Sequence, residues 1–461
     1  MATRRDQLHS YQFLTQRVLS ALVMRETDPA QSPLRRGVGA VFVGVMIAVL
    51  VAAGYGVYGI FTKVGNDNWR SDGAVVVEKE SGASFVYLDG KLHPALNYAS
   101  ALLAARHTPP TVFRVPGKSL TGVPRDLAIG IPQAPSSLPA GDKTVGFPWT
   151  VCSSPGGEGG QTPQTIVTML IGQTVEGGHE LTDDEGLLVT DGTSRYLVWK
   201  GYRYLLRQSD KVIGALFGAP TAARVGKAWL NALPAGVDIG PIDVPKGGTS
   251  TVSGYKVGDL LVSTGSVAAY YLVYPDGLAV LTPVQRALVL GAGEPQPIDV
   301  ARAADSPKSN RLSTSGDPGQ APGNVPKLVT NAAQAPCART DSGRFAPTVS
   351  TGGSVEVSNA IRTPARSPTG TPLVNLVLMP PGRAAVVRMM ASPGAQTGAL
   401  AVVTDTGTRY PVADENSLQY LGFQPGQAIE LPDRLAAQLP AGPTLDAGTA
   451  RQAAPVSRSG G

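Results

Sequence analysis

One uninterrupted apolar stretch stands out in a chain whose other apolar positions come in short runs between polar residues. Residues 37–61 contain no charged side chain and are apolar or small throughout. Because a helix rises about 1.5 Å per residue, about 20 such residues cross a hydrocarbon core of roughly 30 Å. The pattern predicts one transmembrane helix, and no second stretch of that length follows.

The length and depth of this stretch favour a retained anchor over a cleaved signal peptide, whose apolar region spans about 7–15 residues. The flanking charges predict its orientation. Only Lys63 and Arg70 follow closely, whereas six arginines precede it, namely Arg4, Arg5, Arg17, Arg25, Arg35 and Arg36. The N-terminus is therefore expected in the cytoplasm, with most of the chain outside it, in the periplasmic or extracytoplasmic space.

Small side chains recur every fourth residue along the predicted span. They are Ala40, Gly44, Ala48, Ala52 and Gly56. Such a row lets two helices approach closely, which predicts a packing face for a membrane assembly. The alternative is that Gly and Ala are simply common in this sequence.

The segment before the span, residues 5–23, has the apolar spacing of an amphipathic helix. Its stripe consists of Leu8, Tyr11, Leu14, Val18 and Leu22. A helix of this kind either docks on a cytoplasmic partner or lies on the membrane surface. The sequence leaves both possibilities open.

The N-terminal sequence RRDQLHSYQFLTQRVLSALV, followed by Pro-Leu-Arg-Arg before the span, resembles the start of EccB. EccB proteins are single-pass membrane core components of type VII (ESX) secretion systems. The resemblance extends over nearly the whole chain. It implies a large periplasmic domain of repeats around a central sheet, with EccC, EccD, EccE and other EccB copies as partners.

Four hairpin signals indicate internal repeats beyond the anchor. In each of them, an apolar strand is followed by an Asp-Gly or Asp-Thr-Gly turn. The turn residues are Asp89, Gly90, Asp191, Gly192, Asp276, Gly277, Asp405 and Gly407. Three of the hairpins are followed by the tetrapeptide Leu-Pro-Ala-Gly, at residues 138–141, 233–236 and 439–442. The third repeat lacks this tetrapeptide and is expected to end at residues 297–300.

A short helix is predicted between each hairpin and its end, so each repeat is interpreted as a strand, strand, helix module. The expected helices cover residues 94–106, 220–233, 282–290 and 417–421. Strands at residues 165–171, 373–378 and 384–389 come from two distant parts of the chain and are expected to share a central sheet.

The predicted fold is α+β and β-rich, with one N-terminal transmembrane helix and four repeats in a pseudo-two-fold arrangement around a central mixed sheet. The expected segments are 1–36 cytoplasmic, 37–61 membrane, 62–143 repeat 1, 144–186 central, 187–246 repeat 2, 247–325 repeat 3 with a flexible loop, 326–397 central, 398–443 repeat 4, and 444–461 a disordered tail.

Composition supports a strand- and loop-rich exported domain. Gly and Pro make up about a fifth of the 461 residues, against roughly 12% in average proteins. The formal net charge is +5, of which residues 1–36 contribute +3. The remaining charge is too small for a nucleic-acid footprint, and the basic N-terminus is explained by topology and anionic lipid.

The two cysteines, Cys152 and Cys337, both follow the anchor. An even pair in an oxidising compartment predicts a disulfide, which would join the two halves of the central sheet. The alternative is two buried thiols that never meet. A metal site is not expected, because it needs about four ligands and the histidines are scattered.

No catalytic motif is recognised. A P-loop needs a Gly, four residues, and then Gly-Lys-Ser/Thr. At Gly117-Lys118-Ser119 the first Gly is replaced by Val112, and Gly226-Lys227 is followed by Ala228. Neither G-x-S-x-G nor H-E-x-x-H occurs.

Two further clusters have a structural interpretation. The acidic group Asp183-Asp184-Glu185 lacks the spacing of a calcium loop and is expected to be a solvated turn. The aromatic residues Tyr196, Trp199, Tyr202 and Tyr204 could stack on sugars but are expected to pack on a core.

The leading hypothesis is a structural, non-enzymatic subunit of a type VII secretion core complex, needed for protein export and without a cofactor. One alternative is a cell-wall-binding module, because the family's repeats are similar to those of a phage lysin subunit. The other is an ATPase, an activity attributed to the family.

Overall fold

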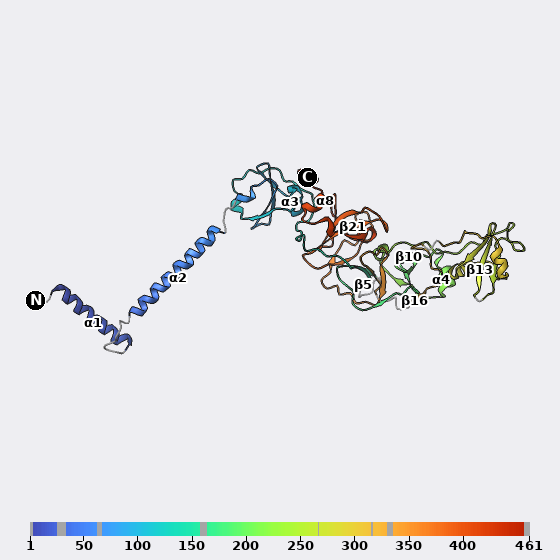
Figure 1. Ribbon diagram of the computed structural model, residues 1–461, viewed down its shortest axis with the longest axis horizontal. Helices are drawn as coiled ribbons and strands as arrows, with labels where there is room; N and C mark the ends of the chain where they lie inside the picture. Colours follow the sequence, from blue (N-terminus) through green and yellow to red (C-terminus); the bar gives the residue numbers. More distant parts are fainter. Residues whose placement is uncertain are drawn as a thin grey trace. The chain divides into compact units, whose positions relative to one another are not determined.

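The computed structural model describes residues 3–24, 34–61, 67–156, 164–265, 267–314, 317–329 and 335–455. The chain divides into two compact units, Met1–Trp69 and Arg70–Gly461 (Figure 1). The first unit contains α1 (Arg4–Met24), α2 (Leu34–Phe61) and the short 3-10 helix η1 (Asp67–Trp69).

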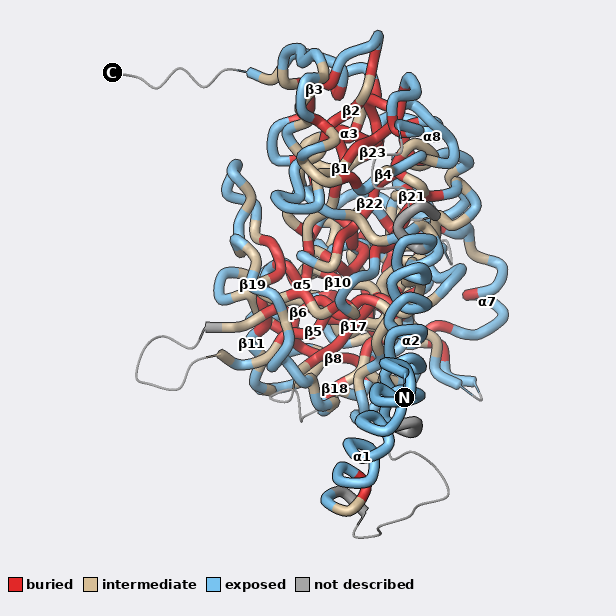
Figure 2. Tube along the Cα trace, turned by 90° about the vertical axis from the view of Figure 1, so that its left-hand side faces the viewer, coloured by how far each residue is buried: buried red, intermediate tan, exposed pale blue. Residues whose placement is uncertain are grey.

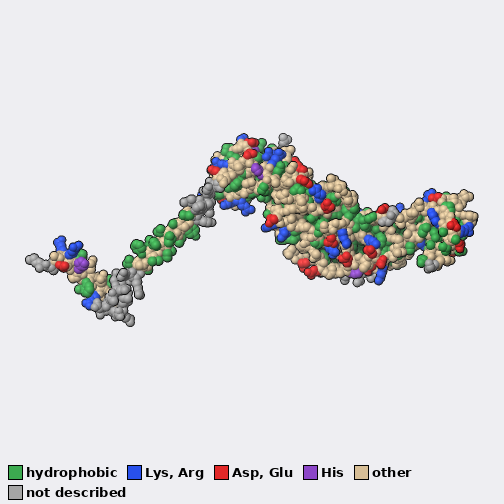
Figure 3. Space-filling view, viewed as in Figure 1, with side chains coloured by type: hydrophobic (Ala, Val, Ile, Leu, Met, Phe, Trp, Pro, Cys, Tyr) green, Lys and Arg blue, Asp and Glu red, His purple; other side chains and the backbone are tan. Residues whose placement is uncertain are grey.

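Helix α2 is the one helix in the described residues that is long and apolar enough to span a membrane. Its apolar part is Gly37–Val57, with a mean hydropathy of 2.4. Figure 3 shows it as a continuous run of hydrophobic side chains. The predicted span and the predicted helix before it both appear as helices, with ends within a few residues of those expected.

The second unit contains four sheets with one shared topology, one for each repeat. Repeat 1 consists of β1 (Ala74–Glu78), β2 (Ser84–Leu88), β3 (Lys91–Pro94), α3 (Tyr98–Ala105) and β4 (Val112–Val115). Repeat 2 consists of β8 (Glu185–Thr190), β9 (Arg195–Trp199), β10 (Tyr202–Leu205), α4 (Ser209–Phe217) and β11 (Ala223–Arg224).

Repeat 3 consists of β12 (Leu260–Ser263), β13 (Ala269–Tyr274), β14 (Gly277–Leu281), α6 (Pro283–Leu288) and β15 (Gln296–Pro297). Repeat 4 consists of β21 (Ala384–Met390), β22 (Ala399–Thr404), β23 (Arg409–Val412), α8 (Glu415–Tyr420) and β24 (Ile429–Pro432). In every repeat the first three strands form an antiparallel meander, and the fourth lies parallel to the first. A parallel neighbour needs a crossover connection, which the helix supplies.

Each repeat then continues through a second short helix. These helices are η2 (Gly117–Leu120), α5 (Lys227–Ala232), α7 (Val300–Asp305) and α9 (Asp433–Ala436). The modules are therefore larger than the predicted strand, strand, helix unit. The predicted helix at residues 220–233 is only α5, and helix α4 was not foreseen.

A proline-containing turn closes each repeat beside its third strand. In repeat 2 the Arg203 backbone N–H donates to the Pro234 carbonyl at 2.9 Å. The Gly236 N–H in turn donates to the Arg203 carbonyl at 2.8 Å. Equivalent pairs of backbone bonds occur in the other repeats. The four closing prolines are Pro124, Pro234, Pro307 and Pro440.

Two predicted repeat ends are therefore wrong. Repeat 1 closes at Pro124, and residues 138–141 instead contact repeat 4, where the Gln427 side chain donates to the Gly141 carbonyl at 2.7 Å. Repeat 3 closes at Pro307 rather than at residues 297–300. A shared tetrapeptide did not imply a shared structural position.

The predicted turns all connect strands, but one of them connects a different pair of strands within its repeat. Asp89, Asp276 and Asp405 lie between the second and third strands of their repeats, whereas Asp191 lies between the first and second. Lys200 occupies the equivalent position in repeat 2. It adopts the left-handed conformation, with φ of 49°.

The central sheet has seven strands in the order β19-β20-β6-β5-β17-β18-β7. They are β5 (Trp149–Gly156), β6 (Gln164–Ile171), β7 (His179–Glu180), β17 (Cys337–Thr340), β18 (Thr348–Thr351), β19 (Ile361–Arg362) and β20 (Leu376–Leu378). The remaining strand, β16 (Lys327–Leu328), pairs with β8. The predicted third central strand, residues 384–389, is instead β21 of repeat 4, so that repeat begins before residue 398.

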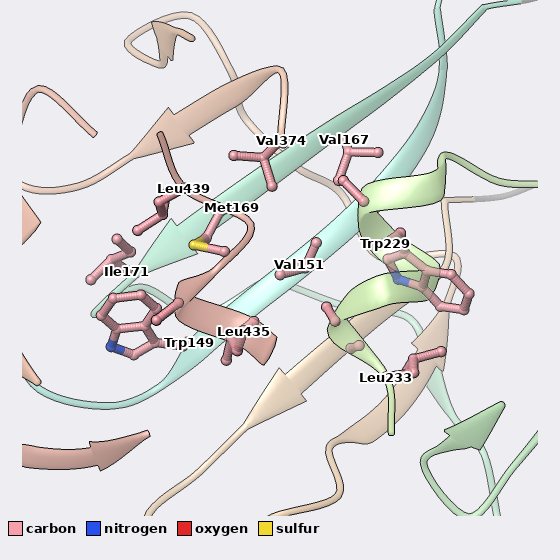
Figure 4. Packing of buried hydrophobic residues seen from close by; sticks show 14 of the residues in the cluster. Trp149, Val151, Val167, Met169, Ile171, Trp229, Leu233, Val374, Leu435 and Leu439 are labelled. Atoms are coloured by element: carbon pink, nitrogen blue, oxygen red, sulfur yellow. The ribbon is translucent and has the colours of Figure 1, made fainter. Parts of the chain in front are cut away.

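The buried side chains show how the repeats combine. Repeats 1 and 4 share one hydrophobic cluster, in which α3 contacts α8, and Figure 2 shows the two repeats side by side. In repeats 2 and 3, α4 contacts α6. Helices α5 and α9 touch each other and pack on the central hairpin β5–β6 around Trp149 and Trp229 (Figure 4). The outer repeats, 1 and 4, therefore pack on each other, and so do the inner repeats, 2 and 3.

Two segments expected to be flexible are packed where they are described. In the predicted tail, Leu445 and Ala450 are buried, and the Ala454 N–H donates to the Ala128 carbonyl at 2.8 Å. In the predicted loop of repeat 3, α7 forms and the Val237 N–H donates to the Gly319 carbonyl at 2.9 Å. Residues 315–316 and 456–461 lie outside the described residues.

Candidate functional site

The apolar stripe of α1 is exposed along its whole length. Its members are between 53% and 77% exposed, and they are Leu8, Tyr11, Leu14, Val18 and Leu22. Phe13 and Leu19 are exposed as well, so apolar side chains are not confined to this stripe. Large exposed apolar side chains on a helix are typical of a surface that contacts a partner or a membrane.

The small-residue row of α2 lies on one face, because residues four apart on a helix are neighbours. A Cβ atom added at Gly44 or Gly56 would meet no other atom within 4 Å. The described part of the chain therefore places nothing against this face. Ala40, Ala48 and Ala52 complete the row, which has the form of a close helix–helix contact.

The predicted disulfide is present. Cys152 on β5 and Cys337 on β17 are direct cross-strand partners with an S–S distance of 2.05 Å. Both are fully buried beside Leu170. The bond closes a sequence separation of 185 residues that includes repeats 2 and 3, and it joins the two chain segments that build the central sheet.

A half-buried arginine links repeat 4 to repeat 2. The Arg434 guanidinium on α9 donates to the carbonyls of Ala232, at 3.2 Å, and Phe345, and it lies 3.9 Å from the centre of the Phe345 ring. Burial lowers the pKa of Arg434 to about 10. This side chain ties repeat 4 to the end of α5 in repeat 2.

Neither near-match to a P-loop has the free backbone amides of that motif. The Gly117 N–H donates to the Glu80 carboxylate at 2.9 Å, so a negative charge already occupies the place of a phosphate. The Gly226 N–H donates to the buried Ser153 hydroxyl at 3.0 Å. A P-loop needs its backbone amides free to surround the phosphates.

The acidic group is a turn, as expected. Glu185 accepts from His179 at 2.7 Å and from the Thr182 N–H at 3.0 Å, while Lys200 lies 3.1 Å from Asp183. The Thr182 bond is the largest contribution that lowers the pKa of Glu185. The described residues contain no group of three or more side chains arranged to hold a metal ion.

The aromatic residues of repeat 2 are largely structural. Tyr204 is buried, and burial raises the pKa of its hydroxyl. Its ring lies 6.2 Å from that of Trp199, whose indole N–H donates to the Asp183 carbonyl at 2.7 Å. Tyr196 and Tyr202 also pack against hydrophobic clusters. No open stacking platform is formed by all four rings.

These features define a class of protein: a single-pass membrane protein whose large domain is a disulfide-linked scaffold of four repeats. The chain belongs to the EccB family, because the family model described as type VII secretion system ESX-1, transport TM domain B, matches residues 1–456.

The chain also aligns with individual relatives over most of the length of both proteins. The chain is 27% identical over 432 residues to the ESX-2 secretion system ATPase EccB2 of Mycobacterium tuberculosis, covering 87% of this chain and 85% of that protein. It is 26% identical over 478 residues to the ESX-3 secretion system ATPase EccB3 of Mycolicibacterium smegmatis, covering 97% and 90%.

Solved structures share the fold. One is an intact ESX-5 inner membrane complex, in which a chain matches with a TM-score of 0.64 at 24% identity, covering 99% of this chain and 96% of that one. Another is an EccB3 dimer from the ESX-3 core complex, with a TM-score of 0.60 at 26% identity, covering 82% of this chain and 100% of that one. The strand-rich α+β architecture with one N-terminal apolar helix is thus the family fold.

Proposed function

We propose that this chain is a structural subunit of a type VII (ESX) core complex in the cytoplasmic membrane and is needed for protein export. The observation that carries the proposal is a family match that includes α1 and α2 as well as the repeats. A protein that shared only the large domain would give no reason to expect the same membrane assembly.

The exposed surfaces fit a subunit role. The α1 stripe would dock on a cytoplasmic partner, the small-residue face of α2 would pack on another membrane helix, and the large domain would associate with further copies of the chain. EccC, EccD and EccE are the proposed partners. The related EccB3 is described as a dimer from the ESX-3 core complex, which supports the inclusion of other copies.

The proposed role is non-enzymatic, although the relatives carry the word ATPase in their names. Its support is the geometry at Gly117 and Gly226, whose amides donate to side chains of the protein itself. ATP turnover by the purified chain tests this point. Turnover that disappears in Lys118→Ala or Lys227→Ala would contradict the proposal, whereas turnover that survives both substitutions would indicate a contaminant.

The proposed orientation places the N-terminus in the cytoplasm, because arginines are concentrated before α2. Alkaline phosphatase fused after Gly461 should be active, and the same enzyme fused before Thr3 should be inactive. A well-expressed but inactive fusion at Gly461 would reverse the orientation.

Copurification in mild detergent tests the assembly itself. A tagged chain should recover a large complex that contains an ATPase component and further copies of the chain. Recovery of a monomer that is retained only by peptidoglycan would instead support the cell-wall-binding function.

A further inference from the structure

A basic cavity of about 510 Å³ lies between repeat 2 and a loop of the central domain. Repeat 2 contributes β11 and the start of α5, and Figure 2 shows both close to β6. The charged residues that line the cavity are Arg224, Lys227, Arg366 and Asp191. Thr165 and Asn375 add polar groups to its wall. Its volume is sufficient for a small molecule, and the cavity is open, with Arg224, Lys227 and Arg366 exposed to solvent.

The charges in this cavity are not balanced by the described part of the protein. Lys227 lies 3.8 Å from Asp191, whereas no described carboxylate forms an ion pair with Arg224 or Arg366. The Arg366 guanidinium donates to the Gly370 carbonyl at 3.1 Å, which fixes its position without neutralising it. Three positive charges therefore face one negative charge.

Repeat 4 shows that the scaffold does not require this charge. When repeats 2 and 4 are aligned on their closing prolines, Glu430 stands at the position of Arg224, and Asp433 at that of Lys227. Both positions are equivalent in structure, because β24 pairs with β21 as β11 pairs with β8, and a short helix follows each. The basic pair is thus a property of repeat 2 and not of the repeat fold.

We propose that this cavity binds a phosphate-bearing small molecule. A phosphate group carries a charge of about −1.5 to −2 at neutral pH, which matches the excess of positive charge among the lining residues. Guanidinium groups recognise phosphate oxygens with two parallel hydrogen bonds, and Lys227 adds a point charge. The site is a binding site and needs no bond to be broken.

Isothermal titration of the detergent-solubilised full-length chain tests the proposal, with inorganic phosphate as the first probe. The double variant Arg224→Glu/Lys227→Asp carries the residues of repeat 4, so the fold should be retained, with a melting temperature lowered by the loss of the Lys227–Asp191 ion pair. Its Kd for phosphate should rise at least tenfold, since each charge-assisted hydrogen bond is worth about a factor of ten. If the double variant does not fold, Arg366→Gln is the second test, and it should independently weaken phosphate binding.

Lys211→Asp on the exposed surface of α4 is the matched control, and it should change the Kd by less than about twofold. ATP and glucose 1-phosphate distinguish the sources of the phosphate: tighter binding of one than of inorganic phosphate identifies a nucleotide or a glycosyl phosphate. Absence of phosphate binding, an unchanged Kd in the double variant, or an equal loss in the control would overturn the proposal.

Discussion

Cys152 and Cys337 covalently connect two distant parts of the chain that also pair as strands and pack in one hydrophobic cluster. The bond closes a loop of 185 residues, for which the entropy model gives about 5 kcal/mol as an upper guide. Because repeats 2 and 3 are inserted within this loop, the bond restrains both ends of the insertion at the central sheet.

Removing the disulfide should destabilise the large domain in a non-additive way. Cys152→Ala and Cys337→Ala should each lower the melting temperature, and the double variant should lose little more than either single variant, because one bond is lost in all three. Thermal unfolding under non-reducing conditions measures the three losses. Additive losses would mean that the two side chains act only through separate packing contacts.

The presence of the disulfide was predictable from two cysteines on the exported side of an anchor. The role of Arg434 was not, because its partners are the backbone carbonyls of Ala232 and Phe345. Backbone acceptors leave no signal in side-chain sequence patterns. The basic cavity was missed for a related reason: its residues come from repeat 2 and from the 365–375 loop, which are adjacent only in the fold.

The repeat signature becomes visible once the closing prolines are aligned. A buried aliphatic residue lies nine positions before each proline, at Val115, Val225, Ile298 and Leu431. A second buried residue lies four positions before it, at Leu120, Leu230, Ala303 and Ala436. The sequence contained this pattern, but strands of two to four residues are too short for a periodicity to identify them.

The closing turn has a steric requirement that repeats 2 and 4 share. A Cβ atom at Gly442 would lie 2.3 Å from the Tyr410 ring, and one at Gly236 would lie 2.3 Å from the Tyr204 ring. Gly442→Ala should therefore destabilise the domain by about 1–3 kcal/mol, as overpacking does. Chemical denaturation measures the change.

Gly426→Ala is the matched control, because its Cβ would meet no atom within 4 Å. It should leave the stability unchanged or slightly increased. Equal effects of Gly442→Ala and Gly426→Ala would contradict the role of the tyrosine contact.

The small-residue face of α2 should matter for assembly and not for insertion. Gly44→Leu or Ala48→Leu keeps the helix apolar but separates it from a neighbour, so recovery of the complex in mild detergent should fall while the membrane fraction is unchanged. Val45→Leu and Val49→Leu on other faces are the controls. Equal damage from these controls would remove any special role for the row.

In the whole molecule, the sequence predicted the anchor and the number of repeats, and the pseudo-two-fold arrangement stays a prediction. The sequence did not predict which repeats share a core. Repeat 1 packs on repeat 4 in one hydrophobic cluster formed by distant parts of the chain. The Arg451 side chain also donates a hydrogen bond to the Ala104 carbonyl at 2.8 Å, although the two residues are more than three hundred positions apart. Local patterns contain no information about such contacts, so strand β21 was assigned to the central sheet instead of to repeat 4.

The proposed function depends on the full chain acting as one subunit in a membrane assembly. Deleting its gene and measuring both protein export and the size of the detergent-extracted complex tests this most directly. Export should stop, the large complex should disappear, and both should return with the unchanged chain but not with a chain that lacks α1 and α2. Normal export and an intact complex in the deletion strain would contradict the proposed function.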